Sequence, residues 1–547
     1  MSNRLYTGFV VIITAILLLL VPSYGLDEPN EPNEPNKPKH FTGVVLGPVL
    51  GQVFNVVRSS DQRHVAFVSV KDNKCWVVVD GNAGQGYDGI GAGSLVFSPD
   101  SRRLAYVALK DKKQLVVIDG NAGPQCDSIG KGALIFSPDS RRTAYIAHRG
   151  GKLMFVVDGQ PGPQYDDAAA ENVPVFSPDS RRIAYVALKG IQQMLVLDGQ
   201  PGPGYAAVRF VAFSPDSRRL AYVVRKSTKW QVVVDEQPGP EYDDIGKDSP
   251  VFSPDGSRIA YRARKAGKWQ LFLDAQAGPL CDNIPEGTLV FSSDSKRIAY
   301  VTGNNYKQMV YVDDKAGPQF DIIKQGHPVF SPNGKHIVYA AKSGDTWQLV
   351  VDGNTGPKYD DIKQGSLVFS PDSKRMAYVV WKDNKWHVIV DGDAGPPYNE
   401  IFGGSLVFSP DSSRLAYAAL NNSYKQVVVV DGSAGPEYDT IMRGSLVFSP
   451  DSKRIAYVAQ KTDQWQVIVD GRAGLQCDEI LEGLLVFSSD SSHFAYAARK
   501  GDRQRLIVDD QLSQLYSGTV CLPAASGEGF EAVIIRNDVL YRLFWKP

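Results

Sequence analysis

Short hydrophobic runs separated by turn-forming residues follow one another along almost the whole chain. The stretch from Ser445 to Asp470 shows the pattern, and it predicts three strands, at Leu446–Phe448, Arg454–Gln460 and Trp465–Val469. Side chains in the middle run alternate between the two faces of a strand. Ser-Pro-Asp-Ser after the first run predicts a turn, because proline presets φ and because Asp and Ser bond the local backbone.

The same block recurs about every 39 residues, which indicates a repeat architecture. The clear copies are marked by Phe97, Phe136, Phe176, Phe213, Phe252, Phe291, Phe330, Phe369, Phe408, Phe448 and Phe487, and a weaker copy at Arg58–Asp61 makes twelve repeats. A fourth short strand is expected after Val-Asp-Gly, for example at Glu241–Ile245. Four short strands in a repeat of this length are typical of a β-propeller blade, which needs neighbours to cover its faces.

Additional strands are predicted at both chain ends. Val44–Leu46 has no partner in its own repeat, while Phe530–Arg536 and Val539–Phe544 flank an Asn-Asp turn, so we expect a composite thirteenth blade. Propellers usually have four to eight blades. About 12–13 four-stranded blades therefore predict an all-β fold of two tandem propellers. These would be residues 41–305 and residues 306–547 with the closing strands, and the boundary would fall within 285–325. A single very large ring or an open arc is the alternative.

The motifs resemble a known repeat. FSPDSRRLAYV (97–107), FSPDGSRIAYR (252–262) and FSPDSKRIAYV (448–458) are similar to the repeat of the TolB-type, WD40-like propeller family, the PD40 repeat. The resemblance spans roughly residues 42–543. It implies a propeller and a role as an envelope scaffold, although propellers host many unrelated activities. The Gly-His and Trp-Asp pairs of true WD40 repeats are absent, which disfavours WD40 proper.

Residues 1–25 have the features of a secretory signal peptide. Arg4 precedes the apolar run Phe9–Val21, and Ser23–Gly25 has the small-x-small pattern of a cleavage site. The run is short for a membrane span. We therefore expect a secreted or periplasmic protein, with a retained N-terminal membrane anchor as the alternative. Residues 26–40 are rich in proline and polar residues and predict an extended linker.

Composition narrows the function classes. A formal net charge of −1 argues against bulk electrostatic capture of nucleic acid or membrane. The seven His are scattered and no Cys-x-x-Cys occurs, so neither a metal site nor a cofactor is predicted. Cys126, Cys281 and Cys477 occupy a repeat position that holds Tyr elsewhere, which predicts small buried side chains. Pairing of Cys75 with Cys521, near the two chain ends, is left open.

No catalytic signature is visible, and we predict that the protein is not an enzyme. There is no Gly-x-Ser-x-Gly, His-Glu-x-x-His or phosphate loop, and too few residues follow the last repeat for a separate hydrolase domain. Aspartates that recur in every Ser-Pro-Asp and Val-Asp-Gly are interpreted as turn formers. The recurrent Tyr of the second strand is interpreted as packing between blades.

Candidate ligand contacts come from two repeat positions. The first opens the third strand and holds Gln in several repeats and tryptophan in five, namely Trp230, Trp269, Trp347, Trp386 and Trp465. It predicts either rim packing or aromatic platforms for a sugar or peptide. The second is the preceding loop, which is basic and includes Lys112, Arg225 and Lys265. We expect both positions near one face, which suits an acidic partner or anionic glycan, unless the loop is an ordinary solvated rim.

Three repeats depart from the pattern, at Ala206–Phe210, Gly303–Tyr306 and His327–Pro328, and these segments are further leads.

The first hypothesis is an exported, non-catalytic propeller that acts as a protein-binding scaffold. The alternative is a carbohydrate-binding propeller or a polysaccharide lyase-like enzyme. The expected partner is another protein or an envelope glycan and not nucleic acid. A membrane is expected only if the N-terminal segment is retained as an anchor.

Overall fold

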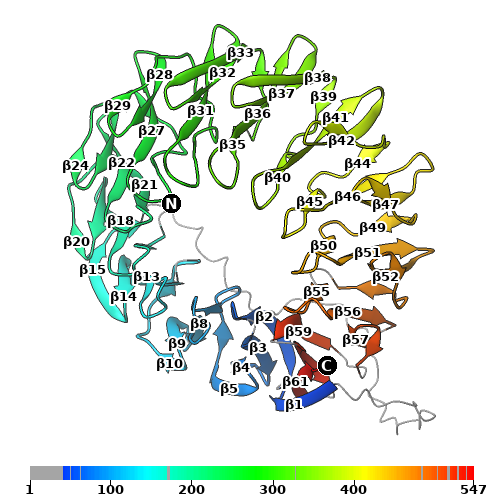
Figure 1. The fold of residues 1–547 in the computed structure, drawn as a ribbon. Helices are drawn as coiled ribbons and strands as arrows, with labels where there is room; N and C mark the ends of the chain where they lie inside the picture. The colour runs from blue at the N-terminus through cyan, green and yellow to red at the C-terminus, as the bar shows by residue number, and fades with distance from the viewer. Residues whose placement is uncertain are drawn as a thin grey trace.

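The structure, a computed structural model, describes residues 41–49, 51–61, 63–132, 134–168, 173–326, 328–481, 485–501, 503–513, 518–526, 529–536 and 539–547. Within these ranges the regular structure is all β, and the strands form thirteen sheets. Figure 1 shows the sheets around one ring in chain order, with the first strand beside the last. The predicted all-β propeller fold is confirmed.

Blade 11 shows how each repeat folds. Its strands are β49 (Thr440–Ile441), β50 (Val447–Phe448), β51 (Ile455–Lys461), β52 (Gln464–Val469) and β53 (Arg472–Ala473). β49 and β50 both pair with β51 and together form one interrupted inner strand. At the interruption, the Ser445 hydroxyl accepts the Val458 N–H at 3.0 Å and donates to the Met442 carbonyl at 2.7 Å. A side chain therefore satisfies the backbone groups that the broken ladder leaves unpaired.

The same order from centre to rim holds in all twelve repeat blades, and Figure 1 places the inner pieces toward the ring centre. The second strands are β3 (Val65–Lys71), β8 (Leu104–Lys110), β13 (Thr143–Arg149), β18 (Ile183–Lys189), β22 (Leu220–Lys226), β27 (Ile259–Lys265), β31 (Ile298–Asn304), β36 (Ile337–Ser343), β41 (Met376–Lys382), β46 (Leu415–Leu420), β51 and β56 (Phe494–Lys500). The third strands are β4 (Lys74–Val79), β9 (Lys113–Ile118), β14 (Lys152–Val157), β19 (Gln192–Leu197), β23 (Lys229–Val234), β28 (Lys268–Leu273), β32 (Lys307–Val312), β37 (Thr346–Val351), β42 (Lys385–Val390), β47 (Gln426–Val430), β52 and β57 (Arg503–Val508). The inner strand is continuous in blade 1, as β2 (Gln52–Arg58), and in blade 5, as β21 (Ala207–Phe213).

The predicted fourth strand, Glu241–Ile245, is divided between two blades. Tyr242 pairs with Trp230 at the rim of blade 5, whereas β25 (Asp244–Ile245) pairs with β27 of blade 6. The outer strand of blade 5 begins as β24 (Gln237–Pro238) and is interrupted by Gly239 and Pro240. Directly after Tyr242 the chain passes to blade 6, where the Asp243 N–H donates to the Arg264 carbonyl at 2.8 Å, so the predicted strand does not continue within one sheet.

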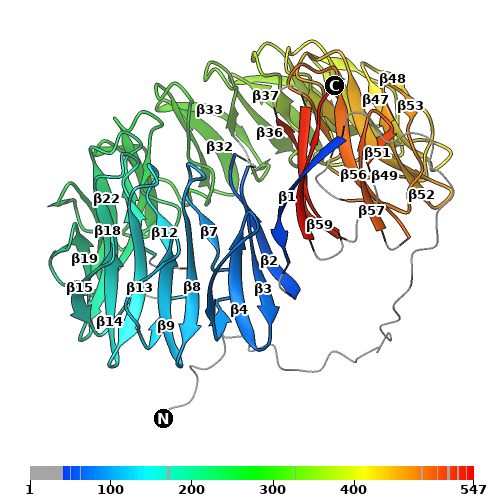
Figure 2. The same ribbon diagram turned by 90° about the horizontal axis from the view of Figure 1, so that it is seen from below.

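A composite blade closes the ring, as predicted from the chain ends. Its order is β1 (Phe41–Pro48), β61 (Val539–Trp545), β60 (Gly529–Arg536) and β59 (Gly518–Ser526). Phe530 and Trp545 join a buried cluster with Leu506 of blade 12, while Val533 and Leu540 join one with Phe67 of blade 1. Figure 2 shows β1 running alongside the C-terminal strands. We call this sheet the closing blade.

No break in the series of sheets marks the predicted boundary within 285–325. Asn305 and Tyr306 form the turn between β31 and β32, which pair with each other in blade 7. Figure 1 shows a single ring, the arrangement left open as an alternative. Whether residues 41–305 and 306–547 behave as two folding units stays a prediction, which separate expression of the two segments would test.

The hydrophobic core lies between blades. In β51, Tyr457 packs toward blade 10 and Ala456 toward blade 12. The Tyr457 ring meets the outer-strand Tyr438 ring edge-on at 6.0 Å, which confirms that the recurrent tyrosine packs between blades. Cys477, at the repeat position of Tyr438, is buried, and burial raises the pKa of its thiol to about 11. Cys75 carries a free thiol, and the side chain of Cys521 lies outside the described residues.

Candidate binding surfaces

The recurrent Ser-Pro-Asp carboxylates are engaged in turns, as predicted. In blade 11 the Ser449 hydroxyl donates to Asp451 at 2.6 Å, and the Lys453 N–H donates to the same carboxylate at 3.2 Å. The hydrogen bond from Ser449 is the main cause of the lowered pKa of Asp451. A carboxylate held ionised inside a turn is poorly suited to acid–base catalysis near neutral pH.

A serine links most of these turns to the turn of the next blade. The Asp451 N–H donates to the Ser491 hydroxyl of blade 12 at 2.9 Å, and Ser491 has a φ of 65°. The equivalent residues, all with positive φ, are Ser101, Ser140, Ser180, Ser217, Ser295, Ser373, Ser412 and Ser452, while blades 6 and 8 have Gly256 and Gly334. Glycine suits this conformation better, but only serine supplies a hydroxyl. The preference for serine is therefore explained by the contact between blades.

An arginine completes most junctions. In blade 11, Arg454 Nε lies 3.1 Å from Asp470 of Val-Asp-Gly, its Nη1 donates to the Ser492 carbonyl at 2.9 Å, and its guanidinium lies over the ring of Phe487. The last two partners belong to blade 12. We call this residue the junction arginine; the others are Arg103, Arg142, Arg182, Arg219, Arg258, Arg297, Arg375 and Arg414. Blades 1, 8 and 12 instead have His64, His336 and His493, each of which contacts the aspartate of its own blade.

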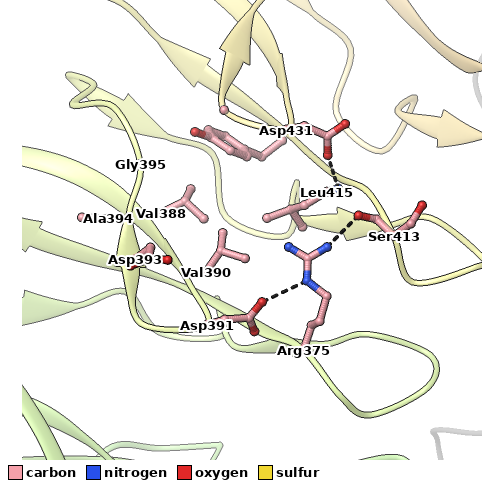
Figure 3. A pocket seen from close by; sticks show the side chains of 12 residues that line it. Arg375, Val388, Val390, Asp391, Asp393, Ala394, Gly395, Ser413, Leu415 and Asp431 are labelled. Atoms are coloured by element: carbon pink, nitrogen blue, oxygen red, sulfur yellow. Dashed lines mark hydrogen bonds and ion pairs between the residues drawn. The ribbon is translucent and has the colours of Figure 1, made fainter.

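A hollow of about 400 Å³ between blades 9 and 10 belongs to one such junction (Figure 3). Arg375 contacts Asp391 at 2.9 Å and donates to the Ser413 carbonyl at 2.7 Å. Asp431 accepts the Leu415 N–H at 2.9 Å. The bond from Arg375 to Ser413 links the two blades, whereas the Asp391 and Asp431 contacts each lie within one blade. No cluster of three or more His, Cys, Asp or Glu that suits a metal ion occurs in the described part of the chain.

The turns between second and third strands lie on the same face as the connections between blades, as predicted. Lys113, which opens β9, contacts Asp127 in the connection to blade 3 at 2.5 Å, and Asp127 also accepts the Gly150 N–H of the blade 3 turn at 2.7 Å. We call this side of the ring the hairpin-tip face. All eight sequence-predicted contact residues lie there, because each is in such a turn or within two residues of it.

The alternation of Gln and Trp at the start of the third strand has a structural cause. Gln426 accepts the Ile441 N–H of blade 11 at 2.7 Å, and Gln114, Gln193 and Gln308 accept the equivalent N–H groups. In blade 9, Lys363 instead donates to the Ile401 carbonyl of blade 10 at 2.7 Å and lies over Trp386. Gln426 thus bonds the next blade directly, whereas Trp386 supports a cation that does so.

Cations already occupy space above several of the tryptophan rings. Arg209 lies 3.8 Å and Arg225 5.4 Å from the centre of the Trp230 ring. Trp269 has Arg262 and Arg264 nearby, and Trp347 has Lys324 and Lys342. A sugar would have to compete with these contacts. The role of Trp230, Trp269, Trp347, Trp386 and Trp465 in ligand binding stays a prediction.

Local ion pairs reduce the basic character of the hairpin-tip face. The lysines that open third strands pair with aspartates of the blade connections: Lys74–Asp88, Lys113–Asp127, Lys152–Asp166, Lys229–Asp243, Lys268–Asp282, Lys307–Asp321 and Lys425–Asp439. Lys112 and Lys265 are exposed. The lysines therefore do not by themselves define a cationic patch for an acidic partner.

Three exposed apolar tips distinguish this face, and sequence analysis identified only one of them as a lead. Ile191 in blade 4, Tyr306 in blade 7 and Tyr424 in blade 10 lie in the turns between second and third strands. Tyr306 ends the divergent segment Gly303–Tyr306. The other two had a similar signal, namely an apolar residue where most repeats have Asp, Asn, Gly or Lys.

Among the remaining leads, Phe210 lies beside Arg209 at a bulge in β21, and His327 lies outside the described residues.

The predicted signal peptide and linker also lie outside the described residues. In the part of the chain that the structure describes, no helix is long and apolar enough to cross a membrane.

Comparison with known proteins points to a propeller family. The family described as "TolB beta propeller domain" (PD40) matches residues 158–364. No curated protein matches the sequence. Solved structures with similarity include a eukaryotic initiation factor (13% identity, 63% of this chain and 95% of that chain, TM-score 0.31), the propeller domain of the Trilobed protease from Pyrococcus furiosus (14%, 49% and 97%, 0.23) and TolB from Acinetobacter baumannii (15%, 55% and 78%, 0.20). The family match confirms the resemblance of the repeats to the TolB-type propeller over residues 158–364 of this chain.

Proposed function

We propose that this chain is an exported, non-catalytic β-propeller scaffold that binds another protein through its hairpin-tip face, in the cell envelope or outside the cell. The three apolar tips carry the proposal. Ile191, Tyr306 and Tyr424 are 92%, 102% and 76% exposed. Tyrosine is enriched at protein interfaces, where its ring buries a large area at low entropic cost.

The backbone conformation at two of the tips disfavours a bulky residue, yet each position holds a tyrosine. Tyr306 and Tyr424 have φ values of 61° and 57°, a region that bulky residues rarely adopt. At the position of Tyr306, blade 9 has Asn384, which tolerates this conformation better. The chain therefore places aromatic residues where Asn would be less strained. Because the tips lie in blades 4, 7 and 10, the expected contact surface follows the ring and is not confined to one blade.

A capture experiment tests the proposal. Purified residues 26–547 are incubated with envelope extract that is untreated, protease-treated or glycosidase-treated. We expect capture to be lost only after protease treatment. We also expect the combined substitutions Ile191→Asn, Tyr306→Asn and Tyr424→Asn to reduce capture at least tenfold. The matched control on the opposite face combines Arg181→Asn, Lys374→Asn and Lys453→Asn, whose side chains are also highly exposed. This control should capture as well as the unmodified chain.

Two other outcomes would contradict the proposed surface. Loss of binding on charge reversal of Lys112, Arg225 and Lys265, with the Asn tip variants unaffected, would assign binding to the basic residues. Loss only after glycosidase treatment, together with loss in Trp386→Ala, would assign it to a glycan and the tryptophan position. That result would also require a test for glycan cleavage.

A further inference from the structure

The outer edge of the closing blade differs from every other outer edge of the ring. β1 spans eight residues, Phe41–Pro48, whereas the outer strands of the repeat blades are two residues long or are six-residue strands with a register shift. β1 is the terminal strand of its sheet, and within the described residues no strand pairs with its other edge. Among these residues, the backbone N–H and C=O groups along that edge therefore have no strand partner.

The repeat blades protect their outer edges by a common device. Nine of them have Gly-Pro in the outer segment: Gly123–Pro124, Gly162–Pro163, Gly202–Pro203, Gly239–Pro240, Gly278–Pro279, Gly317–Pro318, Gly356–Pro357, Gly395–Pro396 and Gly435–Pro436. The proline has no N–H to donate, and the glycine N–H turns inward, as where Gly435 donates to the Val428 carbonyl at 2.9 Å. A neighbouring strand therefore finds no continuous ladder at these edges.

β1 lacks this protection over most of its length. Its sequence, FTGVVLGP, has no charged residue, and its only proline is the last residue. Val44 and Val45 are 52% and 62% exposed, although β-branched residues favour strand pairing. One bulge, between Val45 and Gly47, is the only irregularity in its pairing with β61. A long, uncharged, exposed edge is a strong candidate for pairing with another strand.

We propose that β1 pairs with β1 of a second copy of this chain, antiparallel across a twofold axis, so that the two closing blades form one continuous sheet. The charge pattern favours this occupant. In an antiparallel pair centred on Val44 and Val45, valines face each other and no charges are opposed within β1. A twofold contact is also the commonest arrangement of homo-oligomers.

The test is the mass in solution of the full chain, purified from the cells that produce it. Sedimentation equilibrium over a concentration series should show the monomer, 59.8 kDa for the full chain, converting to twice its mass. Val44→Lys places two like charges near the twofold axis and should weaken dimerisation at least tenfold. Val44→Thr keeps a β-branched, uncharged residue and should leave dimerisation within about twofold.

Two measurements separate this contact from any other dimer. Leu475→Lys adds the same charge at an exposed rim position of blade 11 and should leave dimerisation unchanged. Hydrogen exchange at Thr42–Val45 should slow as concentration rises in the unmodified chain but not in Val44→Lys, whose fold is checked by thermal unfolding. A monomer at every concentration, or a dimer that Val44→Lys leaves intact, would overturn the proposal.

Discussion

The junction between blades 11 and 12 and the junction between blades 8 and 9 are built on the same plan but differ in the residue that reaches toward the next blade, Arg454 in one and His336 in the other. Both have the serine bridge, with Asp451 bonded to Ser491 and Asn333 bonded to Ser373. Arg454 then reaches its own aspartate and a carbonyl of blade 12, whereas His336 contacts Asp352 within blade 8. A long guanidinium spans two blades, while the shorter imidazole bonds only within its own.

The closing junction uses a third solution. Arg542, in β61, donates to the Arg63 carbonyl at 2.6 Å and to Asp80 of blade 1 at 3.0 Å. It therefore makes the contact that a junction arginine makes elsewhere, from a sheet that has no Ser-Pro-Asp motif. On the other side, the His493 ring packs 4.7 Å from the Trp545 ring. The comparison indicates that junction strength varies around the ring, with weaker polar links where histidine replaces arginine.

The largest expected effect is at the closing blade, where the Phe530 and Trp545 rings pack against blade 12. Phe530 is almost fully buried and lies 5.9 Å from the Trp545 ring. Phe530→Ala should lower the free energy of unfolding by about 3–5 kcal/mol, because it leaves a cavity between blade 12 and the closing blade. Chemical denaturation measures this loss. Leu512→Ala, at an exposed position of blade 12, should cost less than about 0.5 kcal/mol; equal effects would contradict the role of the cluster.

Removal of a junction arginine should have a smaller effect. Arg454→Ala loses a charge-assisted hydrogen bond and a cation–π contact, and we expect a cost of about 1–2 kcal/mol after allowance for its partial exposure. His336→Ala should cost less because no contact between blades is lost. Hydrogen exchange of the strands on either side of each junction provides the measurement. A larger loss in the His336→Ala variant would reverse the ranking of the two junctions.

Conversion of a histidine junction should strengthen it. In blade 9, Phe369 and the Lys374 carbonyl stand at the repeat positions of Phe487 and Ser492 in blade 12. His336→Arg would therefore place a guanidinium beside the same two kinds of partner. We expect a gain of about 0.5–1 kcal/mol. Thermal unfolding, with His336→Lys as the variant that keeps the charge without the planar group, tests the gain. An equal effect of both substitutions would attribute it to charge alone.

The smallest effect at neutral pH should come from the turn carboxylates, but it should grow in acid. The pKa of Asp411 is lowered to about 2, mainly by the Ser409 hydroxyl. Because the folded-state pKa lies below the unfolded value of about 3.9, the carboxylate stabilises the fold above that value. This contribution is lost as the pH falls toward 2.

Asn333 of blade 8 is the natural control for this titration, since it accepts the same hydrogen bonds from Ser331 and Lys335. Asp411→Asn keeps the hydrogen bonds but loses the charge, so it should lower stability slightly at pH 7 and reduce its decline between about pH 4 and 2. Urea unfolding across this range measures the difference. An unchanged pH profile would show that Asp411 does not contribute to acid sensitivity.

The repeat pattern was sufficient to predict the blade, the turn roles of the aspartates, the packing of the recurrent tyrosine and the composite closing blade. Each depends on local alternation and turn chemistry, which recur in every copy. The predicted strand Glu241–Ile245 is divided in the structure because Tyr242 pairs within blade 5 and Asp244 within blade 6. Local sequence does not show which blade a residue pairs with. The alternation of Trp and Gln at the start of the third strand did not reveal that both residue types serve contacts between blades.

Local sequence by itself determined the type of repeat, because strand and turn propensities act over a few residues. Tertiary structure decided the arrangement of the thirteen sheets, since the angle between blades is set by side chains packing across each junction. It also decided which surfaces remain exposed. Lysines that looked basic in sequence pair with aspartates about fourteen residues away, and β1 shows an open edge only once its position at the rim is known. These properties depend on residues brought together by the ring.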